Sequence, residues 1–396
     1  MERIIELFFK SANMQRWNDH IRPVNLVELD KQAHKITVAY IISKVEESEN
    51  NEINWIELIN KFLFDFFYRI VLTDLKPPIF HEMMDKKENE LNQYVLSIIE
   101  PKLNDFNPDF ANKFVKYLNS DKDSIEDKIL KASHYIATNW EFKIIYNSGP
   151  FIYGIDKTKK DIEKRIEDYY DLKGVQRIFW DKKLNGFIDL CGQLRFQKRW
   201  AYIPRVPETS VLGHMLMVAA MSYLFTISSI KHPCNKRIYN NFFGGLFHDL
   251  PEVLTKDIVS PIKRSVEGLD DLIKEYETYQ MENEILPLIP ESWGSELKYL
   301  TEDEFDNKII EKGKIKKVVS IGDFNQDKYS PIDGELIEVA DKLSAYMEAI
   351  ASVRYGITSK ELENASKNIK DEFSSKKIPN LNVKEIYKNI EKIINE

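Results

Sequence analysis

A mainly α-helical protein is the fold class that this sequence predicts, on two observations. The chain has only 14 glycines and 15 prolines in 396 residues, so turn signals are too sparse for a β-sandwich or β-barrel. Several long segments instead repeat apolar residues at helical spacing. With 43% hydrophobic and 12% aromatic residues, such helices can bury a sizeable core.

The predicted elements follow in chain order. Residues 211–229 are apolar on nearly every side, which is typical of a buried core helix, and Ser210 stands where an N-cap residue would. Pro251 ends a second, short apolar helix, and Pro287 ends a charged amphipathic one. The other predicted elements are helices at 241–250 and 268–286, a strand or hairpin at 314–324, and a helix at 335–354.

Charge and cysteine content narrow the class of protein. The chain has 64 acidic and 56 basic residues, and the net charge of -8 argues against a general nucleic-acid binder. Two cysteines cannot form a disulfide framework and indicate a reducing compartment. The first ten residues do not resemble a signal peptide, and the longest apolar stretch is too short to span a bilayer. We therefore expect a soluble, cytoplasmic protein with neither a membrane nor a nucleic acid as its partner.

Two histidines and two aspartates fall on the predicted apolar helices. His214 lies within the first of them, the adjacent pair His248 and Asp249 ends the second, and Asp341 lies in the last. Taken singly, His214 has the ordinary interpretation of a core histidine, and Asp341 that of a helix cap or ion-pair partner. A buried carboxylate does need a partner, however, because an unpaired one is very costly. Together, imidazole nitrogens and carboxylate oxygens without a thiolate suit a divalent transition metal.

The order of these residues resembles the HD-domain metal-dependent phosphohydrolases. A closer similarity, to the YfbR-type 5'-deoxynucleotidases, is carried by three segments. Arg199 and Trp200 begin a run that ends 15 residues later at the first histidine, residues 247–263 read FHDLPEVLTKDIVSPIK, and ADKLSAY surrounds Asp341. One departure is visible, because Gly213 stands where that group usually has a glutamate.

The resemblance implies an HD-domain helical bundle and a role for each site residue. Glu252 would be the general acid/base beside the attacking water, and Arg199 would contact the phosphate. Asp257 would contact the sugar 3'-hydroxyl, and Trp200 would crowd the 2' position and so favour deoxyribose. Without the resemblance, Trp200 is equally a core or interface aromatic, and Asp257 a loop cap. The implied metal ligands are His214, His248, Asp249 and Asp341.

The implied cofactor is one divalent metal ion, and the ligand set leaves its identity open among manganese, cobalt, iron, nickel, zinc and magnesium. Such an ion lowers the pKa of bound water and neutralises phosphate charge. Proton relay by a residue such as Glu252 is typically worth about 10²- to 10⁴-fold in rate.

The first part of the chain repeats the order of the motifs in the second part, but several of the motif residues are replaced. Arg16 aligns with Arg199 at an offset of 183 residues, and the offset is 182 at Thr73. Between them, His34 aligns with His214 at an offset of 180. In this alignment Phe66 and Phe67 stand near the His-Asp pair. Ile70 stands near Glu252, and Ser133 stands near Asp341. We therefore predict a degenerate HD-like domain that holds no metal, with chance similarity of two helical domains as the alternative.

This repeat sets the predicted domain boundaries. Residues 1–150 form the degenerate HD-like domain, residues 151–185 a helical connector, and residues 186–396 the catalytic HD domain. An insertion at about 264–333 is charged, and its composition does not distinguish a cover over the site from a solvated insertion. Two tandem HD-like domains would make either a monomeric pseudo-dimer or part of a homodimer.

Three functions are compatible with these residues. The first is a metal-dependent phosphohydrolase that removes the 5'-phosphate from a (deoxy)nucleoside monophosphate. The second keeps the metal site but acts on nucleoside triphosphates, cyclic nucleotides or alarmones. The third, from another class, is a nucleotide-sensing or scaffold protein with little turnover, for which an intact acid/base at Glu252 would be superfluous. In each case the partner is a nucleotide.

Overall fold

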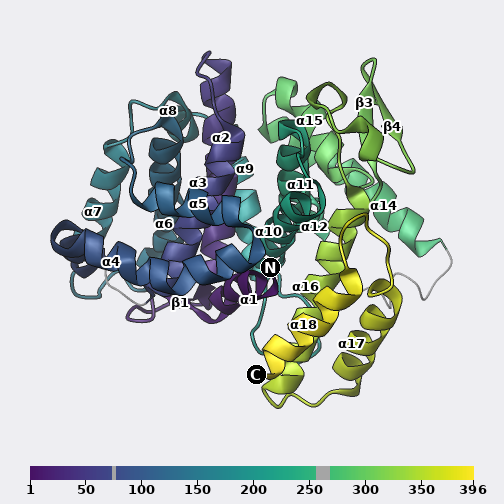
Figure 1. Ribbon diagram of the computed structural model, residues 1–396. Coiled ribbons are helices and arrows are strands. Elements are labelled where there is room, and N and C mark those ends of the chain that lie inside the picture. The colour runs from purple at the N-terminus through teal and green to yellow at the C-terminus, as the bar shows by residue number, and fades with distance from the viewer. Residues whose placement is uncertain (74–76, 256–267) are drawn as a thin grey trace.

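The chain is built mostly from helices, as the computed structural model shows for residues 1–73, 77–255 and 268–396 (Figure 1). This confirms the mainly α prediction. The helices before residue 181 are α1 Glu2–Lys10, α2 Glu28–Ser48, α3 Trp55–Val71, α4 Pro77–Phe106, α5 Pro108–Leu118, α6 Ile125–Ser148, α7 Ile155–Glu167 and α8 Lys173–Trp180. Those after it are α9 Lys182–Gln193, α10 Val211–Ser229, α11 Asn235–Phe247, α12 Glu252–Thr255, α14 Leu269–Gln280, α15 Glu291–Thr301, α16 Gly334–Arg354, α17 Lys360–Phe373 and α18 Val383–Asn395.

Strands are short, and some of their side chains, such as Leu26 and Ile309, are buried. Two antiparallel pairs occur in the described ranges, each of two strands. The strands are β1 Gln15–Arg16 with β2 Leu26–Val27, and β3 Lys308–Glu311 with β4 Lys314–Lys317. The predicted element at 314–324 is thus a hairpin that begins earlier, at Lys308, and its residues after 317 form no strand.

Helix α10 is the central helix of the second half. Ser210 caps its N-terminus, because the Ser210 side chain accepts a hydrogen bond from the Gly213 amide. Nearly all of its side chains are buried, as expected for a helix that is apolar all round. Within the described ranges, α10 alone is long and apolar enough to cross a membrane, but 89% of its most apolar window is buried inside the protein. It is therefore a core helix.

Helix α2 is the corresponding central helix of the first half, and it packs against α10 (Figure 1). The first helix of each half packs on the central helix of the other: α9 contacts α2, and α1 contacts α10. Unlike α10, α2 buries charged side chains, among them Glu28, Asp30, Lys31 and Lys35. Buried charges need partners, so the surroundings of α2 are rich in ion pairs.

The helices that carry the candidate site differ slightly from their predicted bounds. Helix α11 begins six residues before the predicted start and ends at Phe247, so His248 follows the helix as its C-cap. Helix α16 begins one residue earlier than predicted and ends at Arg354 as expected. Helix α14 ends at Gln280, and a π turn and a 3₁₀ turn continue the chain to Leu288.

Candidate metal centre

Two close helix contacts bring the predicted metal ligands together. Gly245 of α11 lies against the backbone of α10, where a Cβ atom on Gly245 would be 2.9 Å from the Ala219 Cα. The neighbouring Gly244 faces Ile337 of α16. Helices α10, α11 and α16 contact one another pairwise, so the end of α11 delivers His248 and Asp249 beside His214 of α10.

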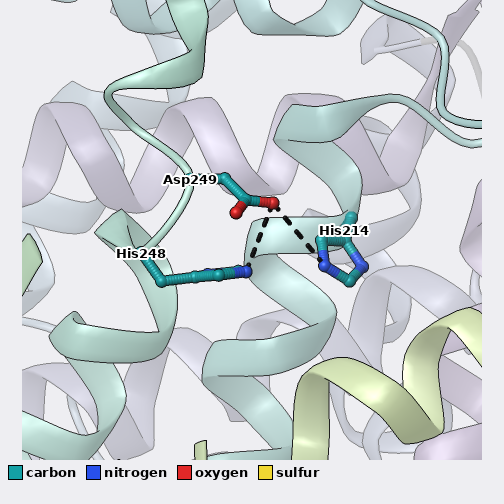
Figure 2. Close-up of side chains that lie close together, drawn as sticks. All are labelled: His214, His248 and Asp249. Carbon is teal, nitrogen blue, oxygen red and sulfur yellow. Dashed lines mark ion pairs between the residues drawn. The ribbon is translucent and has the colours of Figure 1, made fainter. Parts of the chain in front are cut away.

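The two imidazoles and the Asp249 carboxylate converge on one point, and Asp341 bonds to one of the imidazoles. His214 Nε2 lies 2.8 Å from Asp341 Oδ1 and 3.7 Å from Asp249 Oδ2. His248 Nε2 lies 3.3 Å from the same Asp249 oxygen. Figure 2 shows the Asp249 carboxylate reaching toward both histidine rings. One ligand atom from each of His214, His248 and Asp249 falls within a span of 4.8 Å, which is compatible with a single metal ion.

The protonation pattern of His248 tests whether these residues fit a cation. His248 Nδ1 donates to the Gly245 carbonyl oxygen at 2.8 Å, and a carbonyl can only accept. In the neutral ring, Nε2 therefore carries a lone pair, which is buried and has no well-oriented hydrogen-bond partner among the described residues. This lone pair and the Asp249 carboxylate face each other at 3.3 Å, so either a proton on Nε2 or a metal cation between them satisfies both. The residues present thus fit a divalent metal.

The pKa shifts of the two histidines and Asp249 also indicate that this site favours a positive charge. Burial lowers the pKa of His248, but the Asp249 carboxylate outweighs burial and raises it to about 9. Burial by itself would raise the pKa of Asp249, yet His248 and its other cationic neighbours hold it well below its ordinary value. For His214, burial dominates and lowers the pKa, which favours the neutral ring that binds metals. Together the four side chains form a buried site that attracts a cation.

Arg199 and Trp200 lie beside this centre and are held by a residue that the sequence reasoning missed. Arg199 Nη1 lies 3.7 Å from Asp249 Oδ2, and Arg199 Nε donates to Glu348 Oε2 at 3.3 Å. Trp200 Nε1 donates to the same Glu348 oxygen at 2.8 Å. The Glu348 carboxylate also accepts a hydrogen bond from Thr209, at 2.7 Å. Burial raises the pKa of Glu348, but Arg199 leads the neighbours that bring it down to about 2, so this carboxylate is ionised.

Glu252 and Asp257 follow the His-Asp pair. Glu252 begins α12, and its backbone amide donates to the Asp249 carbonyl at 3.1 Å, which ties it to the metal centre. The predicted acid/base thus stands one turn from a ligand. Asp257 lies outside the described residues.

The insertion contributes side chains that no motif indicated. Phe305 lies with its ring centroid 6.3 Å from that of His248, and Lys342 Nζ lies 5.5 Å from the Phe305 centroid. Lys342 also donates to Asp341 Oδ2 at 2.7 Å, and the Asp341 charge raises the pKa of Lys342. Burial raises the pKa of the neighbouring Glu304. Part of the insertion therefore borders the site.

The glycine at position 213 has a steric cause. A Cβ atom on Gly213 would lie 2.7 Å from Asp30 Oδ1 and 3.1 Å from Leu29 Cδ2, both on α2. Asp30 accepts a hydrogen bond from the Ser210 hydroxyl at 2.6 Å. A carboxylate from the first half of the chain therefore lies against Gly213, and any side chain at this position would require Asp30 to shift.

Residues 191–370 match the HD-domain family, which covers every predicted metal ligand. The resemblance to HD-domain proteins predicted from the motifs is confirmed over this stretch of the chain.

Among curated proteins, the chain is similar to three bacterial 5'-deoxynucleotidases. It is 22% identical to that of Vibrio atlanticus over 202 residues, which is 50% of this chain and 90% of the relative. It is 24% identical to that of Photobacterium profundum over 196 residues, 49% of this chain and 88% of the relative. It is 24% identical to that of Shewanella oneidensis over 178 residues, which is 45% of this chain and 78% of the relative. No solved structure matches the chain.

Proposed function

We propose that this protein is a metal-dependent phosphohydrolase that removes the 5'-phosphate from deoxynucleoside monophosphates. The observation that carries the proposal is the convergence of two imidazoles and two carboxylates beside an arginine, within an HD domain. The similarity to proteins named 5'-deoxynucleotidase supports the choice of substrate.

In this proposal His214, His248, Asp249 and Asp341 hold one divalent ion, whose identity is open. The ion supplies charge neutralisation for the phosphate and activates a water molecule. The chain supplies the ligands in a buried, preformed arrangement, which avoids reorganisation on binding.

The residues around the ligands then have separate roles in binding the substrate and moving the proton. Arg199 presents a planar guanidinium that matches phosphate oxygens, and Glu348 fixes its direction by holding Nε. Glu252 moves the proton between the water and the leaving group. Trp200 is half-buried and held by the same glutamate, so its ring has a fixed place from which to crowd a 2'-hydroxyl. Asp257 remains the proposed contact to the 3'-hydroxyl.

A specific observation favours a second candidate, hydrolysis of a nucleoside triphosphate. Lys342 places a second cation beside the metal centre, and its position in ADKLSAY is one that the motif leaves open. A longer phosphate chain would use this extra charge. The product distinguishes the two candidates, because a monophosphate releases phosphate and a triphosphate releases tripolyphosphate.

The test is product identification from matched panels of deoxy- and ribonucleoside mono- and triphosphates, with manganese and cobalt each added in turn. Asp249→Ala serves as the blank, and the exposed Glu361→Ala serves as the control for a lost carboxylate. Phosphate from deoxymonophosphates alone, lost only in Asp249→Ala, is the expected result. Tripolyphosphate would move the assignment to the second candidate. No product from any compound, with metal bound, would exclude both and leave either another phosphoester, such as a cyclic nucleotide or an alarmone, or the sensor interpretation.

We also propose that residues 1–150 form a degenerate HD-like domain, joined through 151–185 to the catalytic domain 186–396 as a pseudo-dimer. Hydrogen bonds support it. In the first half Arg16 Nε and Trp17 Nε1 both donate to Glu141 Oε2 at 2.9 Å, as their counterparts donate to a single glutamate in the second half. The two tryptophans also share an unusual backbone, with φ of 54° at Trp17 and 57° at Trp200.

The backbone pairing supports one constant offset for this region. Gln15 pairs with Val27, and 183 residues later Lys198 pairs with Ser210. The Glu28 amide donates to the Met14 carbonyl, and 183 residues later the Val211 amide donates to the Gln197 carbonyl, both at 2.9 Å. The predicted offset of 180 at one histidine is therefore replaced by 183 throughout this region.

The corrected offset changes which residues correspond. Lys31, not His34, lies opposite the first metal-binding histidine. His34 instead contacts the Ile188 carbonyl at 3.0 Å and the ring of Trp140. Because Glu141 corresponds to the site glutamate at an offset of 207, the residue opposite Asp341 is His134, not Ser133.

A pseudo-two-fold axis is supported by the contact between Asp30 and Gly213. These residues are 183 apart in sequence, and residues that touch their own counterparts lie on such an axis. A cytoplasmic location and the absence of a membrane or nucleic-acid partner remain predictions, as does the oligomeric state.

A further inference from the structure

The centre of the first half carries a lysine and a histidine where the second half carries a metal-binding pair. Lys31 Nζ lies 2.5 Å from His134 Nδ1, and these two residues correspond to His214 and Asp341. Lys31 is fully buried, with 0% of its surface exposed. A buried ammonium group is costly unless it is paired, so this exchange calls for an explanation.

The first half has also lost the His-Asp pair and the acid/base of the centre, although Asp65 lies close by. Phe66, Phe67 and Ile70 stand near the positions of the His-Asp pair and the acid/base in the predicted alignment. None of them can bind a metal ion or carry a proton. The first half therefore has a centre of the same construction without the groups that hydrolysis requires.

Positive charge has been added around the same point. Arg69 Nε lies 3.2 Å from Glu28, and Lys35 Nζ lies 2.8 Å from Asp65. Lys31 bonds to no carboxylate in the part of the chain that the structure describes.

Arg16 is the counterpart of the phosphate-contacting arginine proposed for the second half. It pairs with Glu28 at 2.7 Å through Nη1 and with Glu141 at 2.9 Å through Nε. Its Nη2 donates to no described residue, so one edge of the guanidinium is left to bind a further anion.

The balance of charge leaves this cluster short of an anion. Five cations meet four carboxylates: Arg16, Lys31, Lys35, Arg69 and Arg195 face Glu28, Asp30, Asp65 and Glu141. Burial lowers the pKa of His134 well below its ordinary value, and the next causes are all neighbouring cations, led by Lys31. Burial likewise lowers the pKa of Lys31. A bound anion would relieve both costs.

We propose that this cluster in the first half binds the phosphate group of a nucleotide, without a metal ion and without hydrolysing it. Lys31 and Arg16 would contact the phosphate, and Arg69, whose side chain is 28% exposed, would border the entrance. Lys31, like the corresponding His214, has 0% of its surface exposed. The proposal rests on the correspondence of the two halves and not on the activity of the second.

The experiment uses the full chain with its catalytic centre silenced. The background carries Arg199→Met and Asp249→Ala, and a chelator removes divalent ions. Inorganic phosphate, deoxyadenosine monophosphate and adenosine monophosphate are then titrated in separate calorimetric experiments. We expect one saturable site per chain for at least one of these probes. Equal affinity for phosphate and the nucleotides identifies free phosphate as a sufficient ligand, whereas tighter nucleotide binding identifies a nucleotide site.

Two variants in this background locate the site. Lys31→Met is expected to weaken binding at least tenfold, and the matched Lys86→Met, at an exposed lysine, is expected to leave it unchanged. Because a core lysine can matter for folding, Arg69→Gln provides a second variant at a partly exposed position, with a several-fold loss expected. Circular dichroism confirms that each variant is folded. Absence of saturable binding, or binding that neither variant weakens, would overturn the proposal.

Discussion

The two halves of this chain share a scaffold and differ in the charge at its centre. In each half an arginine and a tryptophan bond to one buried glutamate, and one central helix carries the first residue of the centre. In the second half that residue is His214, which faces two carboxylates. In the first half it is Lys31, which faces a histidine.

Under the proposed repeat, this difference means that the scaffold does not depend on the metal chemistry. Glu141 and Glu348 bond to residues that precede each central helix, whereas the proposed metal ligands and their counterparts differ between the halves. The residues of the centre can then change without loss of the fold. The contact between Asp30 and Gly213, on the proposed pseudo-axis, constrains both halves.

The largest expected effect separates the two centres by activity. Asp249→Ala removes a carboxylate that the second centre needs, so phosphate release from a deoxynucleoside monophosphate should fall by about 10³-fold or more. Lys31→Met changes the corresponding centre of the first half and should leave the catalytic rate constant within a few-fold. Steady-state kinetics on both variants measure this. Equal losses in the two variants would mean that both centres serve catalysis.

Substitution of Glu348 and Glu141 tests the comparison further, because Glu348 borders the proposed substrate site and Glu141 does not. Breaking a buried ion pair costs about 3–5 kcal/mol, so Glu141→Gln and Glu348→Gln should both lower the unfolding free energy, by about 3 kcal/mol. Only Glu348→Gln should raise KM for the nucleotide, about tenfold, with a smaller change in kcat, because Glu348 directs Arg199. Chemical denaturation and steady-state kinetics give both readings. A KM that rises equally in Glu141→Gln would exclude this positioning role.

Exchange of two residues tests the pseudo-axis. Gly213→Asp alone places a side chain against Asp30 and should destabilise the protein by about 1–3 kcal/mol. Asp30→Gly alone leaves the Ser210 hydroxyl without its acceptor and opens a gap. The double exchange restores one carboxylate at the axis and should recover most of the loss in a double-mutant cycle. Additive losses would argue against a shared axis.

The acid stability of the second half depends on Glu348. Its pKa falls from an ordinary value of 4.5 to about 2 in the folded protein, so its ionised form stabilises the fold above pH 4.5. That contribution is lost as the pH falls from 4.5 to 2. The difference in unfolding free energy between the native chain and Glu348→Gln should therefore shrink across this window in denaturant titrations. A constant difference would show that the carboxylate is not ionised in the fold.

The proposed metal ligands could be selected from sequence because each follows a local pattern. His248 and Asp249 are adjacent at a helix end before Pro251, and Asp341 is the only acidic residue in an apolar run of its helix. Glu348 had a signal that went unused, because it lies seven residues after Asp341, two helical turns along the same face.

Other parts of the site could not be found in this way. Phe305 reaches His248 only through the folding of the insertion, which follows no periodic pattern. The match of His34 to the first metal-binding histidine was wrong by three residues. Three residues are nearly one helical turn, so His34 and Lys31 lie near the same face of α2, and sequence order alone does not separate them.

The most direct test of this comparison is the number of divalent ions that one chain binds, measured by native mass spectrometry after loading with manganese. We expect one ion per chain, which is lost in Asp249→Ala and retained in Lys31→Met. Two ions per chain, or one ion that survives Asp249→Ala, would contradict the assignment of a single metal centre to the second half.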